Sequence, residues 1–368
     1  MTTRRDLLKG AAASGAAAVS GIAFCGCSLL DAARAQNAGP RALPVTVNGR
    51  RVKTIDVHAH CHFHEALALL GDEAGRIMPQ TKGAQEHFIV VAERLKGMDA
   101  MAIDMEVLSI NPYWYGKDRD LAARIVAVQN EKLAELCASH PDRFTAFASL
   151  SLQYPDLAVV QLETAVRKQG LRGAAIGGSV LGEDFSAPRF HPVWAKAEEL
   201  GAVLFIHPQS TPDLAKRFKG NGWLSNTIGN PLDTTIALQH LIFEGTLDRF
   251  PGLKIIAAHG GGYLPSYAAR SDHACFVSPQ NCNSEIQLKR KPSEYLNQLY
   301  FDAMVFTPEG LRHLVAQVGA SQIVLGSDHP IPWEEHPVDH VFATETLGDD
   351  DKVAILGGNA ARLFGMDS

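Results

Sequence analysis

Two histidines at the end of an apolar run are the residues best suited to chemistry, in Thr54–His60. Residues two apart on a β-strand point to the same side, so His58 and His60 could converge on one point. Imidazole nitrogens at that spacing are typical ligands of a divalent transition metal. Two exposed histidines at the start of a loop would give the same pattern. The metal hypothesis therefore depends on finding further ligands elsewhere in the chain.

Three further candidates occupy equivalent places in the sequence. His207, His259 and Asp328 each directly follow a short apolar run. One histidine at a strand end is more often a hydrogen-bonded polar residue than a ligand. Four histidines and an aspartate, all at predicted strand ends, favour a metal site.

Strand and helix patterns alternate along the chain, which predicts a parallel sheet. Eight units close naturally into a (β/α)₈ TIM barrel, whose ligands gather at the C-terminal ends of the strands. The predicted strands are Thr54–His58, Met105–Ile110, Phe144–Leu150, Gly173–Gly177, Val203–His207, Lys254–His259, Leu299–Ala303 and Ile323–Asp328. The predicted helices are Leu121–Ser139, Leu157–Gln169, Pro192–Leu200, Thr234–Phe250 and Pro308–Val318. Residues 61–87 and 209–230 are too long for simple connections, so we expect them to cover the C-terminal mouth of the barrel.

Composition agrees with a globular enzyme of 368 residues, 46% hydrophobic and 20% charged. The net charge of −6 and the absence of a basic stripe exclude nucleic acid as an expected partner.

The first 35 residues resemble a twin-arginine export signal. Arg4 and Arg5 precede a weakly apolar run, and Ala33-Arg34-Ala35 provides a small-x-small cleavage site. An N-terminal membrane helix is the alternative, but the many Ala, Gly and Ser residues make it a poor one. We therefore expect a signal at 1–35, a linker or start of the mature chain at 36–50, and a single barrel domain at 51–368. The expected location is the periplasm or the exterior, without stable membrane insertion.

Four cysteines follow the predicted signal: Cys61, Cys137, Cys275 and Cys282. The last two are close in sequence, and an oxidising compartment would allow them to form a disulfide.

Several motifs resemble the metal-dependent amidohydrolase superfamily, specifically the branch of aminocarboxymuconate-semialdehyde decarboxylase and related aromatic-acid decarboxylases. The resemblance covers residues 52–366. The matching pieces are Ile55-Asp56-Val57-His58-Ala59-His60, Phe205-Ile206-His207-Pro208, Ala258-His259-Gly260-Gly261-Gly262, Leu325-Gly326-Ser327-Asp328-His329-Pro330 and Ile355–Phe364, with weaker similarity in Asn226–Pro231 and Leu299–Asp302.

The resemblance implies that one divalent metal is bound by His58, His60, His207 and Asp328, with zinc favoured and manganese as the alternative. It implies that His259 is the catalytic histidine. Two-metal members carry a carboxylated lysine at the end of strand four. This chain has no lysine there, which predicts a single metal. Related decarboxylases commonly have an aromatic residue where this chain has His329.

Two reactions fit these residues. A decarboxylase would use His259 or Asp328 to deliver a proton to the carbon that loses carbon dioxide. A hydrolase or hydratase of a lactone, amide or C–C bond would use the same residues to deprotonate a metal-bound water. The ligand set does not separate the two, and the family branch favours decarboxylation of a small carboxylate. A binding protein with a degenerate barrel is a third, weaker hypothesis, and the family suggests a homodimer by analogy.

Several other residues could line the substrate pocket. Residues 111–116, rich in aromatics, and Phe306 follow predicted strands, so they could form pocket walls. His62 and His64 are expected in a loop, and His191 at the start of a helix. Any of three arginines could neutralise a substrate carboxylate: Arg172, Arg270 and Arg290.

Overall fold

The computed structural model of the protein describes residues 44–77, 81–82, 85–209 and 212–366, which all fall in one unit, Ala42–Ser368. The predicted export segment lies outside the described residues. No helix in the described part of the chain is both long and apolar enough to span a bilayer.

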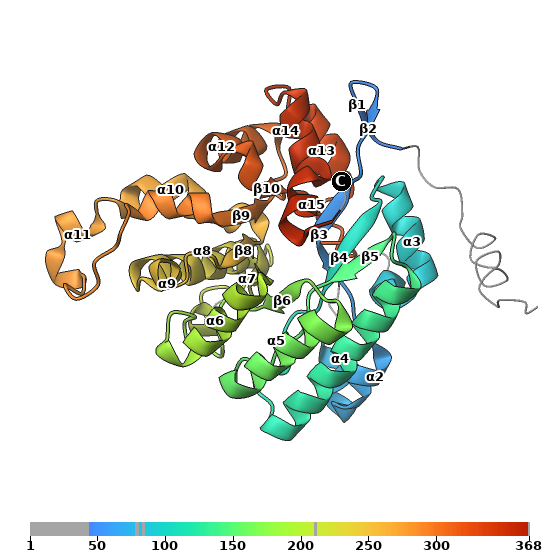
Figure 1. The fold of residues 1–368 in the computed structure, drawn as a ribbon, viewed down its shortest axis with the longest axis horizontal. Coiled ribbons are helices and arrows are strands. Elements are labelled where there is room, and N and C mark those ends of the chain that lie inside the picture. The colour runs from blue at the N-terminus through green and yellow to red at the C-terminus, as the bar shows by residue number, and fades with distance from the viewer. Residues whose placement is uncertain (1–43, 78–80, 83–84, 210–211, 367–368) are drawn as a thin grey trace, which may run out of the picture. The chain divides into compact units, whose positions relative to one another are not determined.

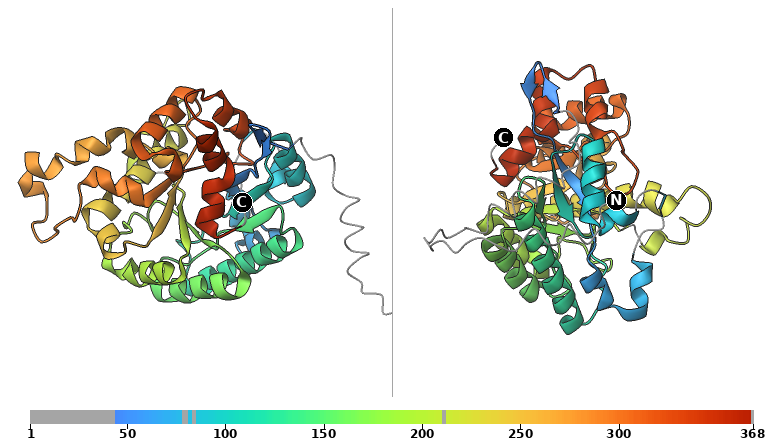
Figure 2. Two further views of the ribbon diagram at one scale, coloured as in Figure 1. Left: turned by 45° about the horizontal axis from the view of Figure 1, so that its top comes forward. Right: turned by 90° about the vertical axis from the view of Figure 1, so that its right-hand side faces the viewer.

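Eight parallel strands form the centre of this unit, and the helices lie outside them (Figures 1 and 2). One sheet has three strands in the order β3-β4-β5, and the other has five in the order β10-β9-β8-β7-β6. The strands are β3 Ile55–His60, β4 Met105–Ser109, β5 Phe144–Ala146, β6 Gly173–Ile176, β7 Val203–Ile206, β8 Lys254–Ala257, β9 Leu299–Asp302 and β10 Ile323–Val324. All eight begin at or within a residue of the predicted positions.

Isolated bridges connect the edges of the two sheets. On one side Ala148 pairs with Ala174, and on the other Asp56 pairs with Leu325. The second edge is extended by a hydrogen bond from the Asp328 N–H to the His58 carbonyl at 2.8 Å. Main-chain contacts therefore connect the two segments that carry the predicted ligands His58 and Asp328.

Helices alternate with the strands and cover their outer faces. The long ones are α3 Val91–Ala100, α4 Arg119–Ser139, α5 Pro155–Gln169, α6 His191–Leu200, α8 Gly229–Phe243, α10 Leu264–Ser271 and α12 Pro308–Val318. The shorter ones are α2 His64–Ala68, α7 Leu224–Thr227, α9 Thr246–Arg249, α11 Ala274–Val277, α13 Pro337–Ala343, α14 Asp349–Val353 and α15 Asn359–Phe364. A short hairpin, β1 Thr46–Val47 with β2 Arg50–Arg51, precedes β3 and buries Val47.

Local sequence explains several helix ends. The Asp118 side chain accepts a hydrogen bond from the Leu121 N–H at the start of α4, and Thr307 caps α12 in the same way through Gly310. The predicted helix 234–250 is wrong as one element, because Gly245 adopts φ 70° and separates α8 from α9.

The core has two parts. One cluster includes the strand residues Val57, Val107, Phe205 and Val324. A larger cluster fills the space between strands and helices. Polar residues lie at the C-terminal ends of several strands, and the predicted site lies there.

Candidate metal centre

Four of the predicted residues meet at the C-terminal ends of three strands. His58 and His60 are on β3, His207 directly follows β7, and Asp328 lies beyond β10. One ligand atom from each lies within 4.8 Å of all the others. The His60 Nε2 to Asp328 Oδ1 distance is 2.8 Å, and the four residues are at most 4% exposed. We call these four residues the His/Asp cluster.

Five polar side-chain atoms of the His/Asp cluster make no hydrogen bond within the described residues. The unpaired atoms are His58 Nε2, His60 Nε2, both ring nitrogens of His207, and Asp328 Oδ1. Buried polar atoms are normally hydrogen-bonded, so a set of unpaired atoms in which one from each residue converges on the same point requires another partner. Three imidazoles and one carboxylate form a donor set that suits a divalent transition metal. The residues present therefore fit the predicted ion.

Neighbouring side chains orient two of the imidazoles. His58 Nδ1 lies 2.7 Å from Asp302 Oδ2, and His60 Nδ1 lies 3.0 Å from the Ser109 hydroxyl. A hydrogen bond from Nδ1–H leaves Nε2 free to bind a metal. Sequence reasoning missed both partners, although Asp302 carried a signal as a carboxylate ending an apolar strand.

Asp302 also fixes the turn after β8. Its oxygens accept hydrogen bonds from the main-chain N–H groups of His259 at 2.9 Å and Gly260 at 2.8 Å. The turn needs glycine, because Gly260 has φ 61° and a Cβ there would lie 2.6 Å from Val305 Cγ1. One carboxylate therefore positions both a predicted ligand and the predicted catalytic histidine.

His259 lies beside the His/Asp cluster without belonging to it. Its ring centroid is 5.2 Å from that of His58 and 5.3 Å from that of His207. Burial and the nearby His58 lower the pKa of His259 to about 4, so the imidazole is neutral at neutral pH. Its Nδ1 is buried and has no partner within the described residues.

The charges of the His/Asp cluster favour cation binding. Burial alone would lower the pKa of His58, but Asp328 and Asp302 outweigh it and raise that pKa to about 10. Burial alone would raise the pKa of Asp328, but His58 and His60 hold it well below its usual range. A positive charge is stabilised at this point, and a metal would replace the proton on His58 Nε2.

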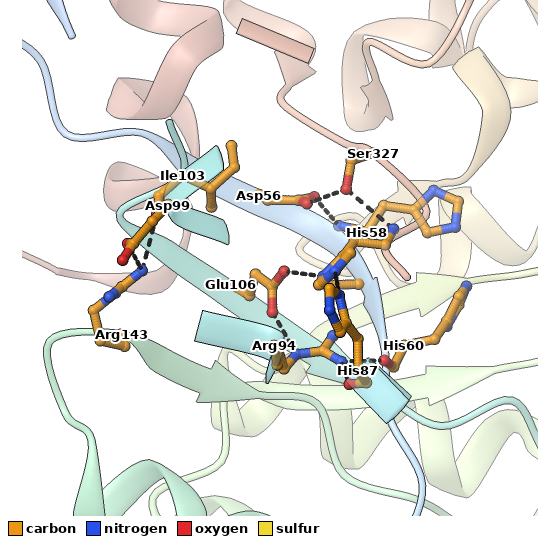
Figure 3. Close-up of polar contacts among 12 residues, drawn as sticks. Asp56, His58, His60, His87, Arg94, Asp99, Ile103, Glu106, Arg143 and Ser327 are labelled. Atoms are coloured by element: carbon orange, nitrogen blue, oxygen red, sulfur yellow. Dashed lines mark hydrogen bonds and ion pairs between the residues drawn. The ribbon is translucent and has the colours of Figure 1, made fainter. Parts of the chain in front are cut away.

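A second buried network adjoins the first (Figure 3). The Glu106 carboxylate lies 2.6 Å from Arg94 Nε and 2.6 Å from His329 Nδ1. Arg94 Nη1 donates to the His60 carbonyl at 2.7 Å, and His329 Nε2 lies 3.0 Å from His87 Nδ1. Burial alone would raise the pKa of Glu106, but Arg94 and His329 lower it to about 2. His329 thus pairs with a carboxylate outside the His/Asp cluster.

Asp56 supports the backbone of the same strand. It accepts a hydrogen bond from the His58 N–H at 2.9 Å and another from the Ser327 hydroxyl. Burial and the nearby Glu106 raise the pKa of Asp56 to about 7. Figure 3 shows Asp56, His58 and Ser327 together.

The other candidate histidines lie outside the His/Asp cluster. His191 begins α6, as predicted, whereas the prediction of a loop at His64 is wrong, because His64 is the first residue of α2. His62 is buried against the rings of Phe88 and Tyr113.

Among the pocket candidates, Trp114 and Tyr115 belong to the core between strands and helices. Phe306 is 50% exposed and lies against Trp333. Arg172 precedes β6 and donates to the Phe364 carbonyl, so it lies at the strand end opposite the His/Asp cluster.

The other two candidate arginines, Arg270 and Arg290, lie in the segment between β8 and β9. Arg270 lies in the last turn of α10. The Arg290 guanidinium lies over the Tyr295 ring at 4.5 Å. Cys275, in α11, forms a disulfide with Cys282.

Comparison with known proteins decides the family. The family model described as amidohydrolase matches residues 55–366, which contain all four residues of the His/Asp cluster. The chain belongs to the amidohydrolase family. This confirms the predicted resemblance.

Relatives of this amidohydrolase are decarboxylases. A 2-amino-3-carboxymuconate-6-semialdehyde decarboxylase of Dictyostelium discoideum is 31% identical over 74% of this chain and 76% of its own length. A gamma-resorcylate decarboxylase of Rhizobium radiobacter is 32% identical over 74% of this chain and 86% of its own length.

A solved structure shares the fold. The dihydroxybenzoic acid decarboxylase of Polaromonas sp. JS666, with bound manganese and the inhibitor 2-nitroresorcinol, superposes with a TM-score of 0.74. It is 26% identical and covers 85% of this chain and 97% of its own. The amidohydrolase therefore has the α/β fold of the TIM-barrel decarboxylases in its superfamily.

Proposed function

We propose that this amidohydrolase is a metal-dependent, non-oxidative decarboxylase of a phenolic or other aromatic carboxylic acid, or of a ring-cleavage product such as a muconate semialdehyde. The observation that carries the proposal is the set of unpaired, buried nitrogen and oxygen atoms in the His/Asp cluster. Relatives with decarboxylase activity on such acids support the reaction type.

The cluster would hold one divalent ion through His58, His60, His207 and Asp328. Three imidazoles favour zinc, and the manganese in the Polaromonas relative makes manganese the alternative. When bound, the ion would draw electron density from the substrate oxygens and so favour departure of carbon dioxide. Strand β6 ends in Ile176, with no lysine that could bridge a second ion.

Side chains of the enzyme would deliver the proton that replaces the carboxylate. The bond between the ring carbon and the carboxylate breaks, its electron pair stays on that carbon, and a proton must then be delivered there. We assign this delivery to His259 or Asp328, either of which would pass on a proton taken up from water: both side chains lie beside the proposed metal, and His259 Nδ1 and Asp328 Oδ1 make no hydrogen bond within the described residues. Asp302 would keep the His259 backbone fixed meanwhile.

We also propose that the eight strands close into a barrel. The bridges between Ala148 and Ala174 and between Asp56 and Leu325 support closure at both sheet edges. The long connections after β3 and β7 would then lie over its C-terminal mouth.

We further propose that residues 1–35 direct export by the twin-arginine route and that the mature enzyme works in the periplasm. The Arg4-Arg5 pair, the small-residue run and the Ala33-Arg34-Ala35 site support this. The disulfide between Cys275 and Cys282 is compatible with an oxidising compartment. Cellular fractionation with an Arg4→Lys, Arg5→Lys variant tests the route, and unchanged export would refute it.

The test of function uses zinc- or manganese-loaded enzyme with gamma-resorcylate, other carboxylated phenols and muconate semialdehydes, followed by mass spectrometry. We expect a product lighter by carbon dioxide, absent with metal-stripped enzyme and with His207→Ala. His336→Ala, which changes an exposed histidine, is the matched control and should retain turnover. A product heavier by water would refute decarboxylation and favour a hydrolase or hydratase.

A further inference from the structure

Three aromatic side chains meet on the connections that leave the metal centre. Trp223 lies in the segment after β7, Phe306 follows β9 and Trp333 follows β10. The Trp223 and Trp333 rings stack with their centroids 5.7 Å apart and their planes at 18°, and Phe306 tilts against Trp333 at 6.2 Å. We call these three residues the aromatic cluster. In Figure 2 (right), the yellow segment that includes α7 extends outward from the unit.

The aromatic cluster is close in the chain to residues of the metal centre. Phe306 is four residues beyond Asp302, and Trp333 is five residues beyond Asp328. Tight turns connect the second pair, because the Ile331 N–H donates to the Asp328 carbonyl and the Trp333 N–H to the Ile331 carbonyl, each at 2.8 Å. Even a fully extended chain would keep the Cα atoms of Asp328 and Trp333 within about 18 Å. The cluster therefore stands beside the metal centre.

Two members of the aromatic cluster have an unusual backbone. Trp223 and Phe306 have φ 49° and 64°, in the left-handed region that bulky residues rarely adopt. They are 47% and 50% exposed, so packing in the core does not account for these conformations. His259 and Asp328 share this region, with φ 57° and 65°. Strained residues gather at functional sites, which favours a ligand-binding role for the exposed rings.

The segment that carries Trp223 is also positively charged. Residues 213–222 contain three cations and one carboxylate, Asp213, a net charge of +2 in a chain of net charge −6. The cations are Lys216, Arg217 and Lys219. All three are exposed, and none makes an ion pair or a side-chain hydrogen bond with another described residue. Unpaired cations beside a binding site attract anionic ligands.

We propose that the aromatic cluster and these three cations form an outer subsite for an aromatic carboxylate. The ring of the ligand stacks on the exposed face of Trp223, and the cations attract its carboxylate. Stacking and charge together select a flat, anionic ligand. The inference rests on the proposed function, and it favours aromatic acids over open-chain ring-cleavage products as substrates.

Ligand-observed NMR of metal-loaded enzyme with benzoate tests the stacking. Trp223→Leu removes the stacking surface, and Phe276→Leu, which removes a side chain 86% exposed on α11, is the matched control. We expect Trp223→Leu to weaken benzoate binding about 2- to 10-fold and Phe276→Leu to leave it unchanged. Trp333→Leu replaces Trp223→Leu if that variant does not fold. Unchanged affinity in a folded cluster variant would overturn the proposal, and a changed mass in gel filtration with it would make the cluster an interface between two copies.

A triple variant tests the charges: Lys216→Gln, Arg217→Gln and Lys219→Gln. The matched control makes the same change in net charge at exposed cations on α4, α5 and α12: Arg124→Gln, Lys168→Gln and Arg312→Gln. We expect only the first variant to bind benzoate more weakly than the wild type at low salt. The difference should disappear in about 1 M salt, where charges are screened beyond about 3 Å. An equal loss in both triple variants would reduce the effect to net charge and overturn the proposal.

Two further titrations define the ligand and the place. Cyclohexanecarboxylate carries the same charge without an aromatic ring and should bind more weakly than benzoate, whereas equal affinity would overturn the proposal. His207→Ala disrupts the His/Asp cluster and should keep benzoate binding that depends on Trp223. Loss of that binding would place benzoate at the metal centre and overturn the outer subsite. Because the readout is binding, failure here leaves the decarboxylase test unaffected.

Discussion

Asp302→Asn is the substitution that best tests how the metal centre is held. One carboxylate oxygen of Asp302 lies 2.7 Å from His58 Nδ1 and accepts from the His259 N–H at 2.9 Å. The other accepts from the Gly260 N–H at 2.8 Å and the Met304 N–H at 3.2 Å. Asparagine keeps the shape but places an NH₂ group on one of these two sides. A donor then faces donors whichever way the amide turns.

The size of the effect follows from these contacts. Loss of a carboxylate that orients a metal-bound imidazole weakens metal binding by about 10- to 100-fold, which corresponds to about 1.4–2.7 kcal/mol. A buried donor left unpaired costs about 1–3 kcal/mol of folding stability. Burial alone would raise the pKa of Asp302, but His58 and His259 lower it, so the wild-type group is a carboxylate at neutral pH. The substitution therefore removes a charge as well as an acceptor.

Metal-stripped protein would be titrated with zinc against a chelator of known affinity. Asp56→Asn is the matched control: Asp56 is equally buried and also adjoins His58, but accepts from the His58 main-chain N–H and not from the ring. We expect Asp302→Asn to bind zinc about 10- to 100-fold more weakly and Asp56→Asn to bind it nearly as the wild type does. Wild-type affinity in Asp302→Asn, or an equal loss in both variants, would refute the argument.

Three further predictions concern neighbouring residues. His259→Ala should keep its metal by elemental analysis while turnover falls about 10²- to 10⁴-fold; loss of metal would instead make His259 a ligand. Glu106→Gln should lower the free energy of unfolding in urea by about 3–5 kcal/mol, because it leaves Arg94 buried without its carboxylate. Glu93→Gln breaks an exposed pair and should change little, and similar effects of the two would contradict this. The pKa of Asp56 is about 7 in the folded protein, against 3.8 in the unfolded chain, so the folded state keeps its proton to higher pH. The free energy of unfolding of the wild type should therefore fall, relative to that of Asp56→Asn, as pH rises from about 4 to about 7. A difference between the two proteins that stays constant with pH would argue against the raised pKa.

Local pattern in the sequence predicted the eight strands and the residues at their ends. The alternation in β3 aligned His58 with His60, and the apolar runs before His207 and Asp328 marked two more strand ends. Parallel strands present their C-terminal ends on one side, so these residues could be expected to meet. Their approach to within 4.8 Å agrees with that reasoning.

Element boundaries were less predictable. Strand β10 ends at Val324 and not at Asp328, because the chain beyond it makes only isolated bridges to β3 and Asp328 adopts φ 65°. Helix α3, Val91–Ala100, was not predicted, since its apolar stripe is weak and Arg94 is buried where the pattern shows a charged residue.

By itself, the sequence determined which residue types stand at the strand ends, and therefore which metal chemistry is available. Only the tertiary structure decided the partners that orient them. Asp302 meets His58 across 244 residues, and Glu106 meets His329 across 223. Side-chain periodicity depends on near neighbours in the chain, whereas such pairs depend on strand order and register, which the packing of the whole unit decides.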